Sequence, residues 1–323
     1  MTGNGRVGLV LGAGGISGIA WHLGVLEALR AHTGWDPATA DVISGTSAGA
    51  VAATVTAAGL QPRSLLRFAE DPATLEDAIA RATAGRTQAG NGPSWPGSLA
   101  LGAGGLLATS PRHRLASLAG FLPRGHRSTD EIRGLVHDAT VDGWPTTTEL
   151  WLHACDYKTG ERVTFGAPGA PHADLAEAVV ASCAVPVYYE PVTIGGRRYV
   201  DGGLYSFANG DAMVAAECDT VFFLSPFATS ARGPLLNTAL YGAARGATLR
   251  QARREIRLLR EAGARVVVIE PTDADVAAMG LNPMDRGRSR HVLETAVASM
   301  DVVLPRALRG LELPLPAALA AAA

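Results

Sequence analysis

Cysteine is scarce in this chain of 323 residues. The three that occur, Cys155, Cys183 and Cys218, lie far apart and form no Cys-x-x-Cys pair. This number and spacing exclude a disulfide framework and indicate a reducing compartment. No cluster of His, Cys and Asp has the spacing of a metal site, so we expect neither a metal nor an organic cofactor.

Long apolar runs are also missing. No run approaches the ~18 residues that a helix needs to span a bilayer. The first residues reach an expected strand by about Arg6, which leaves no room for a signal peptide. We therefore expect a cytoplasmic protein that contacts membranes peripherally at most.

A large net charge of either sign is lacking as well. The formal net charge is -2, and Lys158 is the only lysine. A nucleic-acid-binding protein normally carries a basic patch or stripe, so we expect no nucleic-acid partner. The 47% hydrophobic and 18% charged residues are typical of a folded globular chain.

Apolar patterning predicts alternating strands and helices. Strands are expected over 6–11, 41–45, 148–157, 161–165, 220–226 and 264–271, with a hairpin over 190–203 that turns at Gly195-Gly196. Helices are expected over 19–32, 48–59, 129–139, 172–184 and 240–263. The strand–helix–strand–helix order at the start of the chain predicts a βαβ unit with a parallel, buried sheet.

The length allows one or two domains. We expect a single catalytic domain over 1–312 and a low-complexity tail over 313–323. Residues 85–127 form a Gly/Pro-rich insertion, in which the large apolar residues are Trp95, Leu106, Leu107, Phe121 and Leu122. These side chains favour a cover over an apolar groove, although a plain insertion has the same composition.

Ser47 lies between Gly45 and Gly49 at the turn from an expected strand to an expected helix. A Gly-x-Ser-x-Gly turn exposes the serine oxygen, and the helix behind it contributes free N–H groups. A small-residue turn without chemistry fits the five residues too, so both interpretations stand at this point. Only one strand precedes Ser47, which is too little chain for the usual α/β-hydrolase order.

The glycine cluster at 12–18 follows the first expected strand. A dinucleotide site needs Gly-x-Gly-x-x-Gly and an acidic residue after the second strand. When this motif is aligned to begin at Gly12, Ser17 stands in place of its last glycine. The second strand ends in Gly-Thr-Ser-Ala-Gly instead of an acidic residue. The backbone N–H groups of Gly14 and Gly15 suit an oxyanion hole better.

A base for Ser47 is not evident among the histidines. We interpret His22 as a packed side chain of the first helix, and the other seven share no motif with an acid at a suggestive spacing. Asp201 ends an expected strand and is followed by Gly202 and Gly203. A partly desolvated carboxylate can act as a general base, whereas Asp-Gly-Gly is also a common structural turn.

Three segments in this order, 10–29, 43–50 and 181–204, resemble the patatin-like phospholipases, which are acyl hydrolases with a Ser–Asp dyad. The resemblance extends over most of 6–270. It implies a three-layer α/β/α fold with a central, largely parallel sheet. It also implies Ser47 as nucleophile, Asp201 as base and an oxyanion hole at Gly14 and Gly15. The glycines that complete the motifs are Gly12, Gly18, Gly45, Gly49, Gly202 and Gly203.

Two residues depart from the family pattern. Ala13 replaces the usual glycine, and Ser17 replaces a basic residue. We expect Ala13 to keep its N–H free for the hole. Without the cation, the choice among phospholipid, lysophospholipid and neutral acyl ester stays open.

The sequence thus predicts a serine acyl-ester hydrolase acting on lipid esters. Two alternatives remain: an acyltransferase using the same acyl-enzyme, and a catalytically inactive lipid-binding or scaffold protein. The preferred chain length and the oligomeric state do not follow from the sequence.

Overall fold

The structure is a computed structural model that describes residues 5–60, 123, 125, 127–140, 143–233 and 235–311. The tail at 313–323 and nearly all of the expected insertion at 85–127 lie outside the described residues. Both therefore stay predictions.

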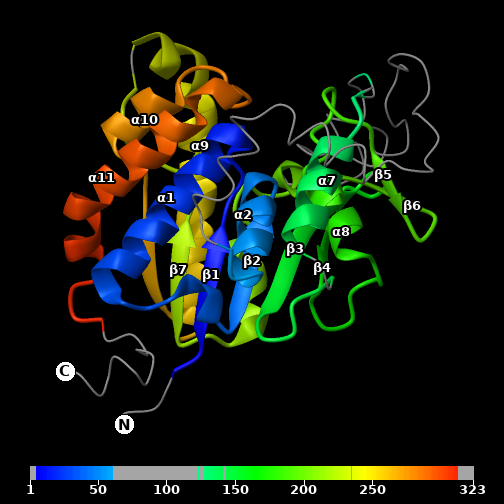
Figure 1. The fold of residues 1–323 in the computed structure, drawn as a ribbon, viewed down its shortest axis with the longest axis horizontal. Coiled ribbons are helices and arrows are strands. Elements are labelled where there is room, and N and C mark those ends of the chain that lie inside the picture. Colours follow the sequence, from blue (N-terminus) through cyan, green and yellow to red (C-terminus); the bar gives the residue numbers. More distant parts are fainter. Residues whose placement is uncertain are drawn as a thin grey trace.

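A mixed sheet forms the centre of the molecule (Figure 1), in which successive pairings connect the strands as β5-β6-β3-β2-β1-β7-β8 and β4 also pairs with β3. The strands are β1 (Val7–Leu11), β2 (Val42–Thr46), β3 (Glu149–Asp156), β4 (Arg162–Phe165), β5 (Val192–Ile194), β6 (Arg197–Asp201), β7 (Thr220–Leu224) and β8 (Arg265–Ile269). Strands β3, β2, β1, β7 and β8 are parallel, whereas β4, β5 and β6 pair antiparallel. The expected largely parallel sheet is confirmed.

Helices lie on both sides of this sheet. They are α1 (Gly15–Thr33), α2 (Ala48–Ala57), α7 (Asp130–Ala139), α8 (Leu175–Ser182), α9 (Leu235–Glu261), α10 (Asp273–Met279) and α11 (Ser289–Ala307). Short 3-10 segments are η1 (Pro37–Thr39), η4 (Gly202–Leu204), η5 (Gly210–Ala216) and η6 (Arg286–Arg288). Helix α1 begins four residues before the expected start at 19, and α10 and α11 were not predicted.

The two faces of the sheet bury separate apolar cores, because successive side chains of a strand point to opposite faces. Leu9 and Leu11 of β1 pack in one core with α1, α2 and α11, which lie in front of the sheet in Figure 1. Val10 belongs to a second core that includes Ile256 and Leu259 of α9. The helix–sheet–helix arrangement confirms the three-layer fold.

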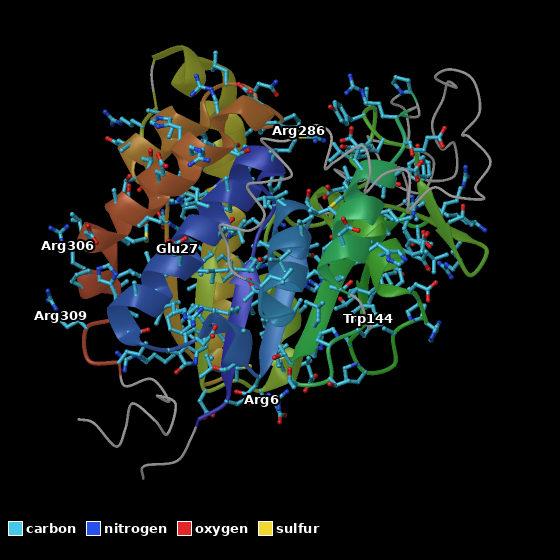
Figure 2. The ribbon with its side chains drawn as sticks, in the orientation of Figure 1. Arg6, Glu27, Trp144, Arg286, Arg306 and Arg309 are labelled. Atoms are coloured by element: carbon cyan, nitrogen blue, oxygen red, sulfur yellow. The ribbon has the colours of Figure 1, made fainter. Side chains whose placement is uncertain are left out.

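The carboxyl ends of β1 and β2 lead directly into the glycine loop and Ser47. In Figure 2, Arg286 lies at this end of the molecule, whereas Arg6, just before β1, marks the opposite end. Open parallel sheets generally bind ligands beyond the carboxyl ends of their strands, which is where both motifs lie. None of the helices in the described ranges is long and apolar enough to cross a membrane.

Candidate active site

Ser47 occupies the sharp turn between β2 and α2. Its backbone angles are φ 55° and ψ -119°, a conformation that non-glycine residues rarely adopt. Such strain persists only where the surrounding structure fixes it, and it is concentrated at functional sites. A Cβ at Gly49 would lie 1.8 Å from the Leu11 carbonyl oxygen, so glycine is required for α2 to lie this close to β1.

The end of α8 holds the Ser47 backbone in this conformation. The Ser47 N–H donates to Ser182 Oγ at 2.9 Å, and that hydroxyl donates to the His153 carbonyl at 2.6 Å. The Cys183 thiol donates to the Ser47 carbonyl at 3.2 Å. Burial raises the pKa of Cys183 well above its usual value, so the thiol keeps the proton that it donates.

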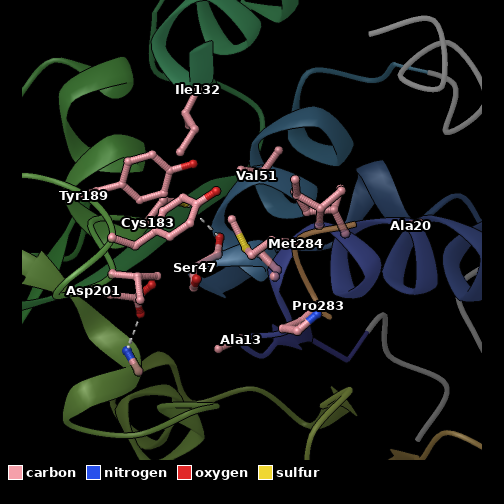
Figure 3. Close-up of a pocket in the computed structure, with 18 of the residues that line it drawn as sticks. Ala13, Ala20, Ser47, Val51, Ile132, Cys183, Tyr189, Asp201, Pro283 and Met284 are labelled. Atoms are coloured by element: carbon pink, nitrogen blue, oxygen red, sulfur yellow. Dashed lines mark hydrogen bonds between the residues drawn. The ribbon is translucent and has the colours of Figure 1, made fainter. Parts of the chain in front are cut away.

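Strand pairing brings Asp201 next to Ser47. Strand β2 pairs with β3 up to Thr46, opposite His153. The next residue of β3, Ala154, pairs with both Val163 of β4 and Asp201 of β6. Strand β4 pairs with the edge of β3 opposite β2, so Asp201, which faces Ala154 from the other side, lies on the edge that β2 occupies. Strand β6 therefore continues along the same edge of β3 as β2. Asp201 therefore occupies the position just beyond the end of β2, where the chain turns at Ser47 (Figure 3).

The Asp201 carboxylate is buried, and this burial raises its pKa to about 6. Hydrogen bonding from Ser47 and from the Gly203 N–H opposes the rise. Oδ1 accepts from Gly203 N at 2.7 Å, drawn as a dashed line in Figure 3. Oδ2 has no hydrogen bond of standard geometry within the described chain, so the Ser47 hydroxyl interacts with the carboxylate only loosely. The site therefore pairs a hydroxyl with an unusually basic carboxylate.

The glycine loop faces the same space. The N–H groups of Gly12 and Ala13 donate to the Leu224 and Phe207 carbonyls, at 2.9 and 2.7 Å. The expectation that the Ala13 N–H stays free is therefore wrong. For the N–H groups of Gly14 and Gly15, which begin α1, the structure gives no partner among the residues it describes.

Ser17 stands where the family pattern has a cation, and it is buried. Its N–H and hydroxyl donate to the Pro283 carbonyl at 3.0 and 3.4 Å. Gly15 also lies against this proline, with φ 63° and an ideal Cβ position 2.7 Å from the Pro283 oxygen. The segment before η6 thus fixes the glycine loop through uncharged contacts.

A cavity of about 450 Å³ opens over Ser47 and Asp201 (Figure 3). Gly14, Gly15 and Gly203 line it beside these two side chains. Its walls are largely apolar and come from α1, α2, α7, the loop after α8 and the loops before η5 and η6. They include Ile19, Leu23, Val51, Ile132, Leu135 and Phe207. An apolar cavity of this size suits an acyl chain.

The cationic side chain of the cavity wall is paired with a carboxylate. Arg286 of η6 is the one cationic side chain among the described lining residues, and it forms an ion pair with Glu131 of α7. Both side chains are partly exposed. Because α7 and η6 approach from different sides, the pair joins two walls of the cavity.

Two buried histidines lie near the motifs without lining the cavity. His22 Nε2 donates to the Gly12 carbonyl at 2.8 Å, and desolvation lowers its pKa to about 4. His153 lies between the hydroxyls of Ser44 and Thr164, at 2.7 and 3.0 Å. Desolvation, with the nearby charge of Arg162, lowers its pKa to about 3. Both rings are neutral and hydrogen bonded away from Ser47, and the expectation that His22 is packed is confirmed.

Among the residues described, no group of His, Cys, Asp and Glu could hold a metal ion. The sequence analysis missed Ser182 and Cys183, which hold Ser47, and Asn209, described below. Ser182 and Cys183 lie inside the segment 181–204 that carried the resemblance, but their contacts depend on where α8 packs. Nothing in the local sequence distinguishes Pro283 or Arg286.

Comparison with known proteins identifies the family. The family model described as "Patatin-like phospholipase" matches residues 9–214. The chain belongs to the patatin-like phospholipase family, and this membership points to lipid acyl hydrolase activity.

Two solved structures are similar at low identity. VipD from Legionella pneumophila is 15% identical with a TM-score of 0.39, and the match covers 93% of this chain and 67% of that one. The type III effector protein ExoU is 18% identical with a TM-score of 0.37, and the match covers 96% of this chain and 54% of ExoU. The chain thus spans about half the length of ExoU. Similarity this low transfers no function.

Proposed function

We propose that the chain hydrolyses lipid acyl esters, with Ser47 as nucleophile and Asp201 as general base. The observation that carries the proposal is the pairing of a serine at a strained turn with a buried carboxylate of raised pKa in one apolar cavity. A carboxylate with a pKa of about 6 is largely ionised at pH 7 and is a stronger base than an ordinary aspartate.

In the first half-reaction, Ser47 Oγ attacks the ester carbonyl while its proton passes to Asp201. The oxygen that gains the negative charge accepts hydrogen bonds from the N–H groups of Gly14 and Gly15. Collapse of the tetrahedral intermediate breaks the ester C–O bond, and the leaving alcohol takes the proton from Asp201. Ser47 then carries the acyl group.

In the second half-reaction, water attacks the acyl-serine and gives its proton to Asp201. Collapse releases the fatty acid and returns the proton to Ser47 Oγ. No proton in the cycle requires a histidine, which agrees with the neutral, hydrogen-bonded states of His22 and His153.

The cavity walls support uncharged esters as the preferred substrates. Ser17 supplies no cation, and Arg286 is paired with Glu131. A phosphate headgroup would have to compete with Glu131 for Arg286. We therefore expect neutral acyl esters to have a higher kcat/KM than phospholipids of the same chain length.

The test is the substitution Ser47→Ala, assayed on p-nitrophenyl acyl esters. We expect activity to fall about 1,000-fold or more, since removal of a nucleophile removes the covalent route. Asp201→Asn should cost ~100- to 10,000-fold. Ser225→Ala is the matched control, because Ser225 is also buried but its hydroxyl has no hydrogen-bond partner within the described chain.

Wild-type activity in Ser47→Ala would overturn the proposal. A fluorophosphonate probe separates an enzyme from an inactive scaffold, since it labels an activated serine. We expect labelling of the wild type and of Ser225→Ala, and none of Ser47→Ala. A wild type without labelling or turnover would favour the scaffold.

A further inference from the structure

Asn209 is a buried polar residue just before η5, in a left-handed backbone conformation with φ 53° and ψ 26°. Its side-chain amide nitrogen donates to Thr46 Oγ1 at 3.1 Å and to the Gly202 carbonyl at 3.3 Å. It also donates to the Ser206 carbonyl at 2.6 Å. The two hydrogens of one NH₂ group are thus shared among three oxygens, one at the end of β2 and two in the segment that follows β6.

Two of these oxygens belong to the immediate neighbours of the dyad. Thr46 precedes Ser47, and Gly202 follows Asp201. Strands β2 and β6 do not pair with each other, and β3 is the strand with which both pair. The Asn209 amide is therefore a direct link between the ends of the two strands.

We propose that Asn209 is a positioning residue that fixes Ser47 and Asp201 relative to each other by bonding Thr46 and Gly202 at once. The inference rests on the proposed function, because it concerns the dyad that performs the reaction. Its effect passes through the backbone, since Asn209 does not line the cavity.

The surroundings orient the amide. Arg162 lies 3.5 Å from Asn209 Oδ1 and forms an ion pair with Asp211, so the amide oxygen faces a cation. The NH₂ group then faces the three acceptor oxygens. An aspartate at this position would direct a carboxylate at those oxygens and lose every donor. Asparagine also adopts the left-handed conformation more readily than most residues.

A structural role alone is the competing explanation. The bond to the Ser206 carbonyl fixes only the loop, and a loop anchor would affect stability without affecting the chemistry. A positioning role predicts a fall in kcat without a rise in KM, because the cavity wall is unchanged while the reacting groups are displaced. It also predicts a change in the pH profile, because Asp201 would sit in a different environment.

The experiment compares Asn209→Gly, Thr46→Val and Glu217→Gly in the full chain. Glycine at 209 keeps the left-handed backbone and removes the amide. Thr46→Val removes one acceptor and preserves shape. Glu217→Gly is the control, because Glu217 has the same backbone region, with φ 50°, at the exposed far end of η5. Each variant is assayed for kcat, KM, pH profile and thermal stability.

For Asn209→Gly we expect kcat to fall roughly 10- to 100-fold at unchanged KM, as misplaced reacting groups cost about this much. The acidic limb of its pH profile should move to lower pH, because a loosened strand end admits water to Asp201. Thr46→Val should lower kcat about 2- to 10-fold, the effect of one hydrogen bond. Glu217→Gly should keep the wild-type kcat and pH profile.

Wild-type kcat and pH profile in the folded fraction of Asn209→Gly would overturn the inference. If Asn209→Gly does not fold, an unchanged kcat in Thr46→Val overturns it instead. Failure of the proposed function gives a different result, since Ser47→Ala would then retain activity. With Ser47→Ala inactive and both Asn209 and Thr46 variants fully active, the dyad stands and only the positioning role fails.

Discussion

At the scale of single residues, the electrostatics of Asp201 determine how the reaction depends on pH. Burial raises its pKa to about 6, and only the ionised carboxylate can accept the Ser47 proton. We expect kcat/KM to rise with pH through a midpoint near 6 and then to level off. A pH profile of acyl-ester hydrolysis measures this midpoint.

Histidine substitutions provide the control for that profile. His22→Ala and His153→Ala should leave the midpoint near pH 6 in the fraction that folds. The pKa values of the two imidazoles, about 4 and about 3, lie below this midpoint, so both rings are already neutral there. If the acidic limb of the pH profile disappears when one histidine is substituted, or if that variant is as inactive as Ser47→Ala, the catalytic group is a triad and not a dyad.

The same raised pKa affects the stability of the fold. The folded-state pKa of Asp201 lies above its usual value of 3.8, so the folded state binds the proton more tightly than the unfolded state. This stabilising contribution is complete below about pH 4 and is lost as pH rises through 6. Asp201→Asn should therefore be more stable than the wild type at pH 8, by on the order of 1 to 3 kcal/mol, in urea denaturation. The difference should shrink towards pH 4.

Asp156 is the matched control with the opposite sign. Although burial acts to raise its pKa, hydrogen bonds from Thr159, Arg197 and Lys158 outweigh burial and lower it. Its stabilising contribution is present at neutral pH and lost at low pH. Asp156→Asn should be less stable than the wild type at pH 8. Equal effects from the two substitutions would contradict this account of both carboxylates.

Ser47 and Asp201 could be selected as candidate site residues from the sequence because each sits in a short contiguous motif whose glycines are needed locally. The partners that hold them could not. Ser182 reaches the Ser47 N–H only because α8 ends beside β2, and Asn209 bonds two strand ends from a loop. Such contacts depend on non-local packing, which leaves no pattern in the neighbouring residues.

At the scale of elements, apolar patterning predicted every strand of the described sheet, because buried strands need continuous or alternating apolar residues. It did not predict that β6 lies along the same edge of β3 as β2, the feature that joins Ser47 to Asp201. Helix α1 begins in the glycine loop, where low helix propensity concealed it. Helix α11, with Pro305 inside, forms against α1 through tertiary packing.

The close approach of α2 to β1 predicts a sharp difference between two glycines. Gly49→Ala would place a Cβ 1.8 Å from the Leu11 carbonyl oxygen, so α2 would have to move and carry Ser47 with it. We expect it to misfold or to lose both stability and activity. Gly59→Ala, at the open end of α2 with φ 69°, should cost only about 1 to 2 kcal/mol and keep the activity per folded molecule.

Circular dichroism melts and active-site titration with a fluorophosphonate would separate these two effects. A Gly49→Ala variant with wild-type melting temperature and labelling rate would show that α2 does not need this close packing.

At the scale of the whole molecule, segments from both ends of the chain form the walls of the cavity over Ser47 and Asp201. Helices α1 and α2 come from the first 57 residues, while Pro283, Met284 and Arg286 come from the segment before α11. Helix α7, the loop after α8 and residues around η4 and β7 supply the remaining walls. The volume available to an acyl chain is therefore a property of the packed layers and could not be predicted from any single segment.

This arrangement predicts that substitutions in two walls of the cavity shift the preferred acyl-chain length in opposite directions. Ala20→Leu, on α1, adds bulk to the cavity and should lower turnover of long-chain esters while short-chain turnover survives. Leu135→Ala, on α7, removes bulk from a half-buried lining residue and should shift the preference towards longer chains. The measurement is kcat/KM across a series of p-nitrophenyl esters from short to long. Parallel losses at every chain length in both variants would mean that the acyl chain binds elsewhere.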